Sequence, residues 1–358
     1  MKPLRLLALT LFFLLAACQP APPPAVATAL PLPTETLVDT PPAAPPLNST
    51  ARPQTGPIER IEVPHPARLQ WSAAGDQLYI TTFNGLVIYN ALAFQTLHSH
   101  DLEEPVILLD VSAASSLAAM RQENGWIDIV SLPDFDPVQS IQVAPDYPAS
   151  GSIAPSGEWL VTSAPDEIAA LVWDIATGEQ VRTLTGFETA APVYTVYFAP
   201  GGDQLVWWAR GTVQLQDFET GELGQPVQHE DFVSAITLSP DGQTLVTAAA
   251  GTVDGEFQPL VLLWDAARGD LLGEPKSAVL LPGQPVNALA FSPDGQTLAA
   301  GAGTEIILWD AASQQELTRL KGHSEGITAL AYSPDGRYLA SASSDGTVLL
   351  WQTDQPQY

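Results

Sequence analysis

Short apolar runs alternate with small or polar residues along most of the chain, and turn residues separate these runs at regular intervals. Residues 232–250, 285–303 and 326–344 read FVSAITLSPDGQTLVTAAA, PVNALAFSPDGQTLAAGAG and GITALAYSPDGRYLASASS, each with a Ser-Pro-Asp-Gly turn between two alternating runs. Alternation of period two in Val, Ile, Leu and Thr predicts half-buried strands, and Pro, Asp and Gly suit tight turns. The sequence therefore predicts an all-β fold built from hairpins.

The same pattern occurs in weaker form earlier in the chain, at 66–83, 105–120, 148–165 and 192–211. Counted from the first residue of each turn, successive units are separated by 40, 42, 45, 40, 53 and 41 residues. These first residues are Ser72, Ser112, Ala154, Ala199, Ser239, Ser292 and Ser333. A self-similar period of this length predicts seven supersecondary units that bury their hydrophobic faces against one another.

Each unit closes on a third run that ends in an aromatic residue or its substitute, and three runs end in Trp-Asp, at residues 173–174, 264–265 and 309–310. The period, the turns and the Trp-Asp ends together resemble the WD-repeat β-propeller family over residues 58–358. This resemblance implies a monomeric, seven-bladed propeller, in which four-stranded antiparallel sheets surround a central channel.

The two ends of the repeat region predict how the ring closes. The last unit stops after its third strand at Trp351, which would leave an exposed sheet edge. The segment IERIEV, residues 58–63, precedes the first unit and has no blade of its own. We expect this segment to pair with the outside of the last blade and to latch the ring.

The last unit alone retains the Gly-His pair of the family and an Asp six residues before its Trp. The resemblance implies a hydrogen-bonded structural tetrad of His323, Ser341, Asp345 and Trp351, with Ser343 as the less favoured hydroxyl. Ser, His and Asp could also form a hydrolytic triad, but the family places these residues inside the blade. The other units lack this set, and we expect their blades to rely on apolar packing.

The N-terminal segment predicts export and lipid anchoring. Lys2 and Arg5 precede an apolar run from Leu6 to Leu15, which is typical of a signal peptide and too short to span a bilayer core of about 30 Å. The run ends in Leu-Ala-Ala-Cys18, which resembles the lipobox of bacterial lipoproteins and implies cleavage and fatty acylation, such as palmitate, at Cys18. Ordinary cleavage and release is the alternative.

The next segment, from residue 19 to residue 57, contains twelve prolines and almost no charge. Proline cannot donate to helix or sheet hydrogen bonds, so this segment is predicted to be a disordered tether. The predicted organisation is a signal peptide at 1–17, a lipidated N-terminus and linker at 18–57, and a propeller at 58–358. We expect an extracytoplasmic protein of the cell envelope, held on the cell membrane or, in a cell with two membranes, on the outer one.

The chain is strongly acidic, with 40 Asp and Glu against 13 Lys and Arg and a formal net charge of −27. This charge repels phosphate backbones, so nucleic acid is not expected as a partner, whereas a basic protein surface would be attracted. Cys18 is the single cysteine, which excludes a disulfide within one chain.

The sequence offers little catalytic or metal-binding chemistry. Among the histidines, only His98 and His100 have a spacing that could place two rings on one side of a strand, and we place them in a polar connection between blades. Two imidazoles fall short of the three or four ligands of a zinc site. A phosphate loop, an EF-hand, a Gly-x-Ser-x-Gly elbow and a dinucleotide fingerprint are absent from the sequence. We therefore predict no enzyme activity, metal or cofactor.

In the WD-repeat family, partners commonly bind the face that carries the loops before the first strand and between the second and third. Acidic and aromatic residues meet in those loops, and a nine-residue insertion, GTVDGEFQP, extends the fifth unit. The candidate residues are Glu104, Asp146, Tyr147, Asp231, Phe232, Asp254, Glu256, Phe257 and Glu325. Aromatic residues anchor interfaces and carboxylates select basic partners, so we predict a protein-binding platform, acting as a scaffold, receptor or assembly factor. The alternative is a propeller enzyme or a small-ligand-binding protein of the cell envelope.

Overall fold

The computed structural model describes residues 56–82, 85–101, 107–122, 124–143, 150–164, 169–187, 195–209, 211–229, 232–253, 256–274 and 285–353. Residues 50–358 form one compact unit. The predicted signal peptide, Cys18 and nearly all of the tether lie outside the described residues. Every regular element within the described ranges is a β-strand, and none of these ranges contains a helix long and apolar enough to span a membrane.

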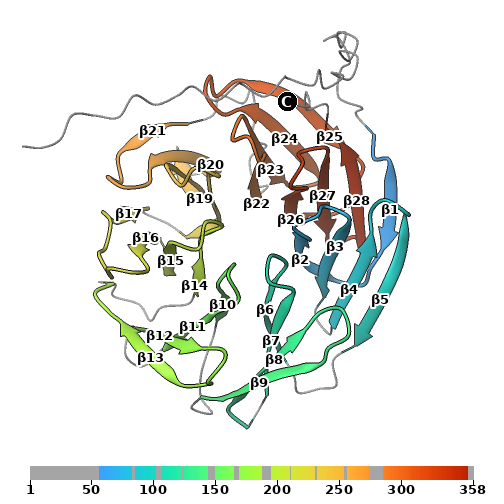
Figure 1. Ribbon diagram of the computed structural model, residues 1–358. Helices are drawn as coiled ribbons and strands as arrows, with labels where there is room; N and C mark the ends of the chain where they lie inside the picture. The colour runs from blue at the N-terminus through green and yellow to red at the C-terminus, as the bar shows by residue number, and fades with distance from the viewer. Residues whose placement is uncertain are drawn as a thin grey trace, which may run out of the picture. The chain divides into compact units, whose positions relative to one another are not determined.

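Seven antiparallel sheets of four strands each form a ring (Figure 1). The innermost strands are β2 (Pro66–Trp71), β6 (Ile107–Ser112), β10 (Gly151–Ile153), β14 (Thr195–Phe198), β18 (Val233–Leu238), β22 (Val286–Phe291) and β26 (Ile327–Tyr332). The second strands are β3 (Gln77–Thr82), β7 (Leu117–Arg121), β11 (Trp159–Ala164), β15 (Gln204–Ala209), β19 (Thr244–Val253), β23 (Thr297–Ala302) and β27 (Tyr338–Ser343). The prediction of a seven-bladed propeller is confirmed.

The outer half of each sheet completes the blade, and we number the blades 1 to 7 in the order of β2, β6, β10, β14, β18, β22 and β26. The third strands are β4 (Gly85–Asn90), β8 (Trp126–Ser131), β12 (Ala169–Asp174), β16 (Thr212–Asp217), β20 (Glu256–Asp265), β24 (Glu305–Asp310) and β28 (Thr347–Gln352). The outer strands are β5 (Gln95–Asp101), β9 (Pro137–Gln142), β13 (Gln180–Leu184), β17 (Val227–Gln228), β21 (Leu271–Gly273), β25 (Glu316–Lys321) and, in blade 7, β1 (Glu59–Glu62).

The recurrent Ser-Pro-Asp-Gly turn is held by its own side chains. In blade 5, Ser239 Oγ accepts the Thr244 N–H at 2.9 Å and donates to the Asp241 carboxylate at 2.5 Å. Gly242 follows with φ near 71°, a conformation that favours glycine. The same bonds recur from Ser292 in blade 6 and Ser333 in blade 7. The aspartates of this motif are therefore turn residues.

The ring closes between the two ends of the propeller. Strand β1 pairs antiparallel with β28, from Glu59 opposite Leu350 to Glu62 opposite Thr347. Backbone hydrogen bonds at both ends extend this pairing, and Ile61 and Val63 are buried against blades 7 and 1. The first strand of the ring thus covers an edge that the last blade would otherwise expose.

The hydrophobic core is divided into seven clusters, and each lies between two neighbouring blades. In the cluster between blades 6 and 7, for example, Leu308 packs with Leu339 and Trp351. Because apolar burial contributes roughly 25 cal/mol per Å², each blade depends on its neighbours for most of its stabilisation. A rigid ring follows, and it positions the loops on both faces.

Candidate functional site

The structure brings the four residues of the expected tetrad together in blade 7. The Trp351 indole N–H donates to Ser341 Oγ at 2.8 Å, and Ser341 Oγ lies 2.8 Å from His323 Nε2. His323 Nδ1 lies 3.1 Å from the Asp345 carboxylate. These distances fit one direction of donation, from Trp351 to Ser341, from Ser341 to Nε2, and from Nδ1–H to Asp345. Ser343 instead donates to the Glu325 carbonyl oxygen at 3.0 Å.

The electrostatics of the tetrad favour a neutral imidazole beside an ionised carboxylate. Burial lowers the pKa of His323, although Asp345 opposes this shift. Burial alone would raise the pKa of Asp345, but hydrogen bonds from Thr347, the Ser324 backbone N–H and His323 lower it to about 2. The Asp345 side chain is only 4% exposed, so its charge is stabilised by these donors rather than by water.

The order Ser, His, Asp is also that of a hydrolytic triad, and the burial of the serine argues against that use here. Ser341 and Trp351 are 0% and 1% exposed, and the Ser341 oxygen already accepts the indole N–H. A nucleophile must reach the substrate and a base at the same time. The geometry of these residues is that of a network that ties β27 and β28 to the segment before β26.

The other blades were expected to rely more on apolar packing, and in blades 3, 4 and 5 a single indole hydrogen bond adds to that packing. Their indole N–H groups donate to polar side chains within the blade: Trp173 to Thr162 at 3.0 Å, Trp207 to Gln216 at 2.9 Å and Trp264 to Thr247 at 2.8 Å. The signal was in the sequence, because Thr162 and Thr247 lie eight residues after the first turn residue of their units, as Ser341 does.

The two histidines of the HSHD segment lie in a strand rather than in a connection, which corrects the sequence reading. His98 and His100 belong to β5, where they pair with Ile88 and Leu86 of β4. The His100 ring stacks on Phe135 of blade 2, with 4.0 Å between ring centroids. Within the described ranges, no group of three or more His, Cys, Asp or Glu side chains is arranged to hold a metal ion.

Two of the candidate partner-binding residues, Phe232 and Glu325, are described with their side chains, and both are exposed. Phe232 is 62% exposed and lies beside the half-buried Trp208, with 6.3 Å between ring centroids. Glu256 and Phe257 lie in β20. The remaining candidates, Glu104, Asp146, Tyr147, Asp231 and Asp254, lie outside the described residues.

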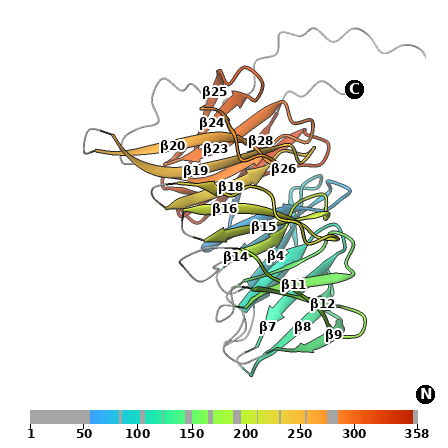
Figure 2. The same ribbon diagram turned by 90° about the vertical axis from the view of Figure 1, so that its left-hand side faces the viewer.

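The insertion in the fifth unit lengthens two strands instead of forming a loop. Strands β19 and β20 have ten residues each and pair as far as Val253 opposite Glu256, whereas the other second strands have five or six. At roughly 3.3 Å per residue, the extra length amounts to about 13 Å. Figure 2 shows this hairpin projecting from the ring. Its tip lies on the face from which β18 starts and extends beyond Phe232, because the first two strands of a blade are antiparallel.

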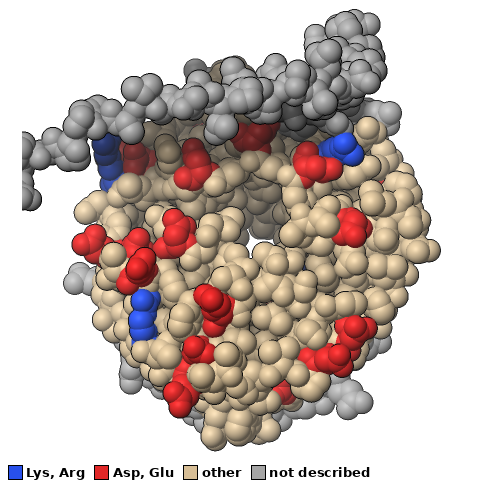
Figure 3. Space-filling model, viewed as in Figure 1, with Lys and Arg blue, Asp and Glu red and all other residues tan. Residues whose placement is uncertain are grey.

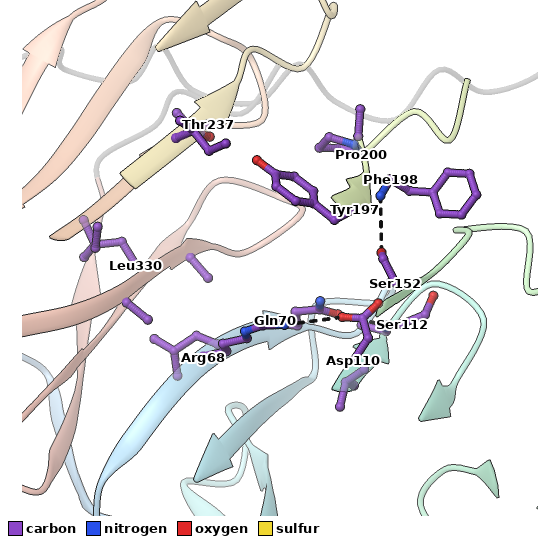
Figure 4. Close-up of a pocket in the computed structure, with 18 of the residues that line it drawn as sticks. Arg68, Gln70, Asp110, Ser112, Ser152, Tyr197, Phe198, Pro200, Thr237 and Leu330 are labelled. Carbon is purple, nitrogen blue, oxygen red and sulfur yellow. Dashed lines mark hydrogen bonds and ion pairs between the residues drawn. The ribbon is translucent and has the colours of Figure 1, made fainter. Parts of the chain in front are cut away.

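A hollow runs through the centre of the ring and has a volume of about 790 Å³. Its walls are the seven innermost strands (Figure 4). The residue two positions before the turn is polar in blades 1 to 5 and alanine in blades 6 and 7. These residues are Gln70, Asp110, Ser152, Tyr197, Thr237, Ala290 and Ala331, and all of them except Ala290 line the channel. The sequence analysis missed this set, although an alignment of the units places its members in one column.

Polar side chains of the channel wall accept hydrogen bonds from backbone N–H groups of the next blade. Gln70 accepts the Ala113 N–H at 3.1 Å, Asp110 accepts the Ile153 N–H at 2.8 Å, and Ser152 accepts the Phe198 N–H at 3.3 Å. These bonds join blades 1 to 4 in sequence along the inner wall. Burial raises the pKa of Asp110 to about 6, against the opposing effects of the Ile153 N–H, Arg68 and Ser152.

Comparison with known proteins agrees with this architecture. Residues 222–255, 276–310 and 314–352 match the family of the WD domain, G-beta repeat. The chain is similar to the small ribosomal subunit protein RACK1 of Caenorhabditis elegans, with 34% identity over 36% of this chain and 37% of that protein. It is also similar to the WD repeat-containing protein SL1-17 of Schistosoma mansoni, with 30% identity over 41% of this chain and 45% of that protein.

A more distant similarity, 26% identity over 44% of this chain, is to 18% of the periodic tryptophan protein 2 homolog of Neurospora crassa. The chain thus matches less than half the length of each of these three relatives. The matched repeats and the seven-bladed ring together support a WD-repeat propeller.

Proposed function

We propose that this protein is a lipid-anchored, extracytoplasmic platform that binds another protein through one face of its propeller. The observation that carries the proposal is the combination of the exposed Phe232 with the projecting β19–β20 hairpin, both on the face from which β18 starts. Similarity to WD-repeat proteins, one of which is named as a ribosomal subunit protein, supports a role in binding.

The surface chemistry indicates what such a partner looks like. An exposed aromatic side chain supplies a large contact area at a low entropic cost, so Phe232 and the adjacent Trp208 are suited to anchor an interface. The net charge of −27 favours a partner with a basic surface and increases the rate of encounter with it. Figure 3 shows carboxylates around the ring on the face that it presents, with few basic groups among them. The charge therefore attracts such a partner, while the aromatic pair and the hairpin select the binding face.

The binding face is tested by crosslinking in intact source cells, with recovery of the full-length protein from the membrane fraction and mass spectrometry of attached proteins. Two variants probe the face: Trp208→Ala with Phe232→Ala, and Asp231→Lys with Asp254→Lys and Glu256→Lys. The matched control is Leu92→Ala with Phe94→Ala, because these side chains are 66% and 46% exposed on the turn between β4 and β5. We expect a crosslinked protein that is lost in both test variants and kept in the control. Equal crosslinking by all of them would contradict the proposed face.

The anchor is tested separately, because it rests on Cys18 alone. The wild-type chain should incorporate a labelled fatty acid and sediment with membranes, whereas Cys18→Ser should do neither. Sedimentation of the unlabelled Cys18→Ser variant with membranes would show that another part of the chain, or a partner, holds it there.

A further inference from the structure

The wall of the central channel combines polar and apolar side chains. Blades 1 to 5 contribute the polar members of the repeat position described above, whereas blades 6 and 7 contribute Leu289, Leu330 and Ala331 beside the polar Asn287 and Thr328. The channel volume of about 790 Å³ falls within the range of small-molecule sites, roughly 300 to 1,000 Å³. A hollow of this kind is suited to a ligand with a polar head and an apolar body.

Arg68 is the single basic residue among the described residues that line the channel. Its guanidinium Nη1 donates to the Leu109 carbonyl oxygen at 3.2 Å, which holds the group against the wall. Asp110 is the nearest carboxylate, but its oxygen lies 4.0 Å from Nη1, beyond hydrogen-bond distance. The Arg68 side chain is 61% exposed, so its other N–H groups face the open channel and can take a bidentate acceptor.

Asp110 is poorly placed to neutralise Arg68 permanently. Its side chain is only 11% exposed, and one carboxylate oxygen already accepts the Ile153 N–H. The Ser152 hydroxyl also hydrogen-bonds to it. Since burial penalises the ionised carboxylate, an anion bound at Arg68 would drive Asp110 toward its neutral form.

Tyr197 supplies another polar group in the channel. Figure 4 shows its ring reaching into the channel from β14, with its hydroxyl directed away from Arg68 and Asp110. Burial raises the pKa of Tyr197, and the charge of Arg68 acts against this shift, so the phenol is neutral and able to donate. Its hydroxyl has no hydrogen-bond partner within the described parts of the chain.

We infer that the channel binds a small monocarboxylate with an apolar body, whose carboxylate pairs with Arg68 while its body packs against Leu289 and Leu330. One guanidinium matches one negative charge, and a dianion would leave a second charge unpaired beside Asp110. This site needs neither Phe232 nor the β19–β20 hairpin, and it shares only Trp208 with the protein-binding face.

The inference is tested by calorimetry on the full-length chain with 3-phenylpropanoate as the probe. Matched probes are 3-phenylpropan-1-ol, which lacks the charge, 3-phenylpropylamine, which reverses it, and acetate, which lacks the body. We expect binding of 3-phenylpropanoate and at least about tenfold weaker binding of each of the other three, because each loses either the ion pair or the apolar contact.

Three variants assign the contacts, and unchanged melting temperatures show that they are folded. Arg68→Gln should weaken binding of 3-phenylpropanoate by about tenfold or more. Ala331→Leu should weaken it by narrowing the channel at blade 7, next to Leu330. Arg60→Gln is the matched control, because Arg60 is an exposed arginine of β1 outside the channel. It should bind like the wild type.

The pH dependence of probe binding distinguishes an Arg68 that contacts the ligand from one that has only a structural role. The charged groups of the described channel wall are Arg68 and Asp110, and its other titratable groups are Tyr197 and Tyr332. Binding should therefore tighten about fivefold or more from about pH 7.5 to about pH 5.5, as Asp110 is neutralised, and Asp110→Asn should remove this dependence. The inference is overturned if the wild type shows no binding at about 10 mM probe, or if Arg68→Gln or the alcohol binds equally well.

Discussion

Blades 6 and 7 are close copies in sequence and differ in their buried polar groups. Both have a Ser-Pro-Asp-Gly turn with the same hydrogen bonds, and both bury the tryptophan of their third strand, Trp309 at 0% and Trp351 at 1% exposure. The Trp351 N–H donates to Ser341, whereas the Trp309 N–H has no partner among the described residues, because Ala300 occupies the corresponding position. The alternating strands, the turn and the inter-blade core are therefore sufficient to form a blade, and the tetrad adds to a blade that already exists.

The two blades also differ in where their outer strand comes from. Blade 6 takes β25 from the chain that directly follows β24, whereas blade 7 takes β1 from the other end of the propeller. Closing a ring with a distant segment costs more chain entropy than adding the next strand along the chain. Blade 7, which has the complete tetrad, is thus also the blade whose closure costs more chain entropy. The following experiments separate the contribution of the β1–β28 pairing to stability from that of the tetrad.

Removing the distant strand should have the largest effect. Deletion of residues 58–63 removes the β1–β28 hydrogen bonds and the buried Ile61 and Val63. We expect a loss of at least about 4 kcal/mol in the free energy of unfolding and a drop in melting temperature of about 10 °C or more. Thermal and urea unfolding of the full-length chain measure both. A deletion of equal length in the tether, residues 44–49, is the control, and an unchanged melting temperature after loss of 58–63 would contradict the role of β1.

Breaking the tetrad should have the next largest effect. Ser341→Ala leaves the Trp351 N–H without its acceptor and His323 Nε2 without its donor, both in a buried site, so we expect a loss of about 3 kcal/mol. Ser99→Ala, on the exposed outer strand β5, should change stability by less than about 0.5 kcal/mol. Urea unfolding of the two variants decides the comparison. Equal stabilities would mean that blade 7 is held like blade 6, by packing alone.

The propeller could be predicted because its determinants are local and repeated. Within about twenty residues of chain, alternating Val, Ile and Leu together with a Ser-Pro-Asp-Gly turn define one hairpin. Because the pattern occurs seven times, it can be recognised even though some copies are degenerate. The latch at 58–63 followed from counting strands and from the cost of an open edge. The nine-residue insertion was misjudged as a loop because the register between β19 and β20 continues through it, which depends on pairing and not on turn residues.

The polar features of the blades and the channel were less accessible to sequence reasoning. Asp110 and Arg68 occupy ordinary polar positions of their strands in the sequence. Only the ring, which brings β2, β6 and β10 together, buries Asp110 and leaves the exposed Arg68 beside it. The Trp–Thr pairs of blades 3 and 5 lack the histidine that made the tetrad recognisable. Both sets occupy fixed columns of the repeat, so a comparison of the units position by position would have found them.

Acid should weaken the tetrad of blade 7. The pKa of Asp345 is lowered in the folded state from 3.8 to about 2, so its contribution to stability is present above pH 3.8 and is lost as the pH falls toward 2. Burial also lowers the pKa of His323 from 6.5, so a second contribution is lost as the pH falls below 6.5. Between about pH 7 and about pH 3, the stability advantage of the wild type over Asp345→Asn should shrink by about 1 kcal/mol.

Urea unfolding at a series of pH values measures this difference. Trp309→Phe in blade 6 is the control, because Trp309 has no titratable partner among the described residues, and its stability difference from the wild type should not vary with pH. An advantage over Asp345→Asn that stays constant with pH would show that Asp345 acts only through the shape of its side chain.

The smallest expected effect is a gain in stability, obtained by giving blade 6 the hydroxyl acceptor that Ser341 supplies in blade 7. Ala300→Ser places a hydroxyl in the position that Ser341 occupies in blade 7. There it can accept the Trp309 N–H, which in the wild type has no partner within the described part of the chain. We expect stabilisation of about 0.5 to 1 kcal/mol, below the full value of a buried hydrogen bond because the new hydroxyl has no histidine to receive its proton. Unfolding of Ala300→Ser, Trp309→Phe and the double variant forms a mutant cycle. If the gain arises from the indole N–H, it disappears when Trp309 is phenylalanine; a gain that persists there comes from packing instead.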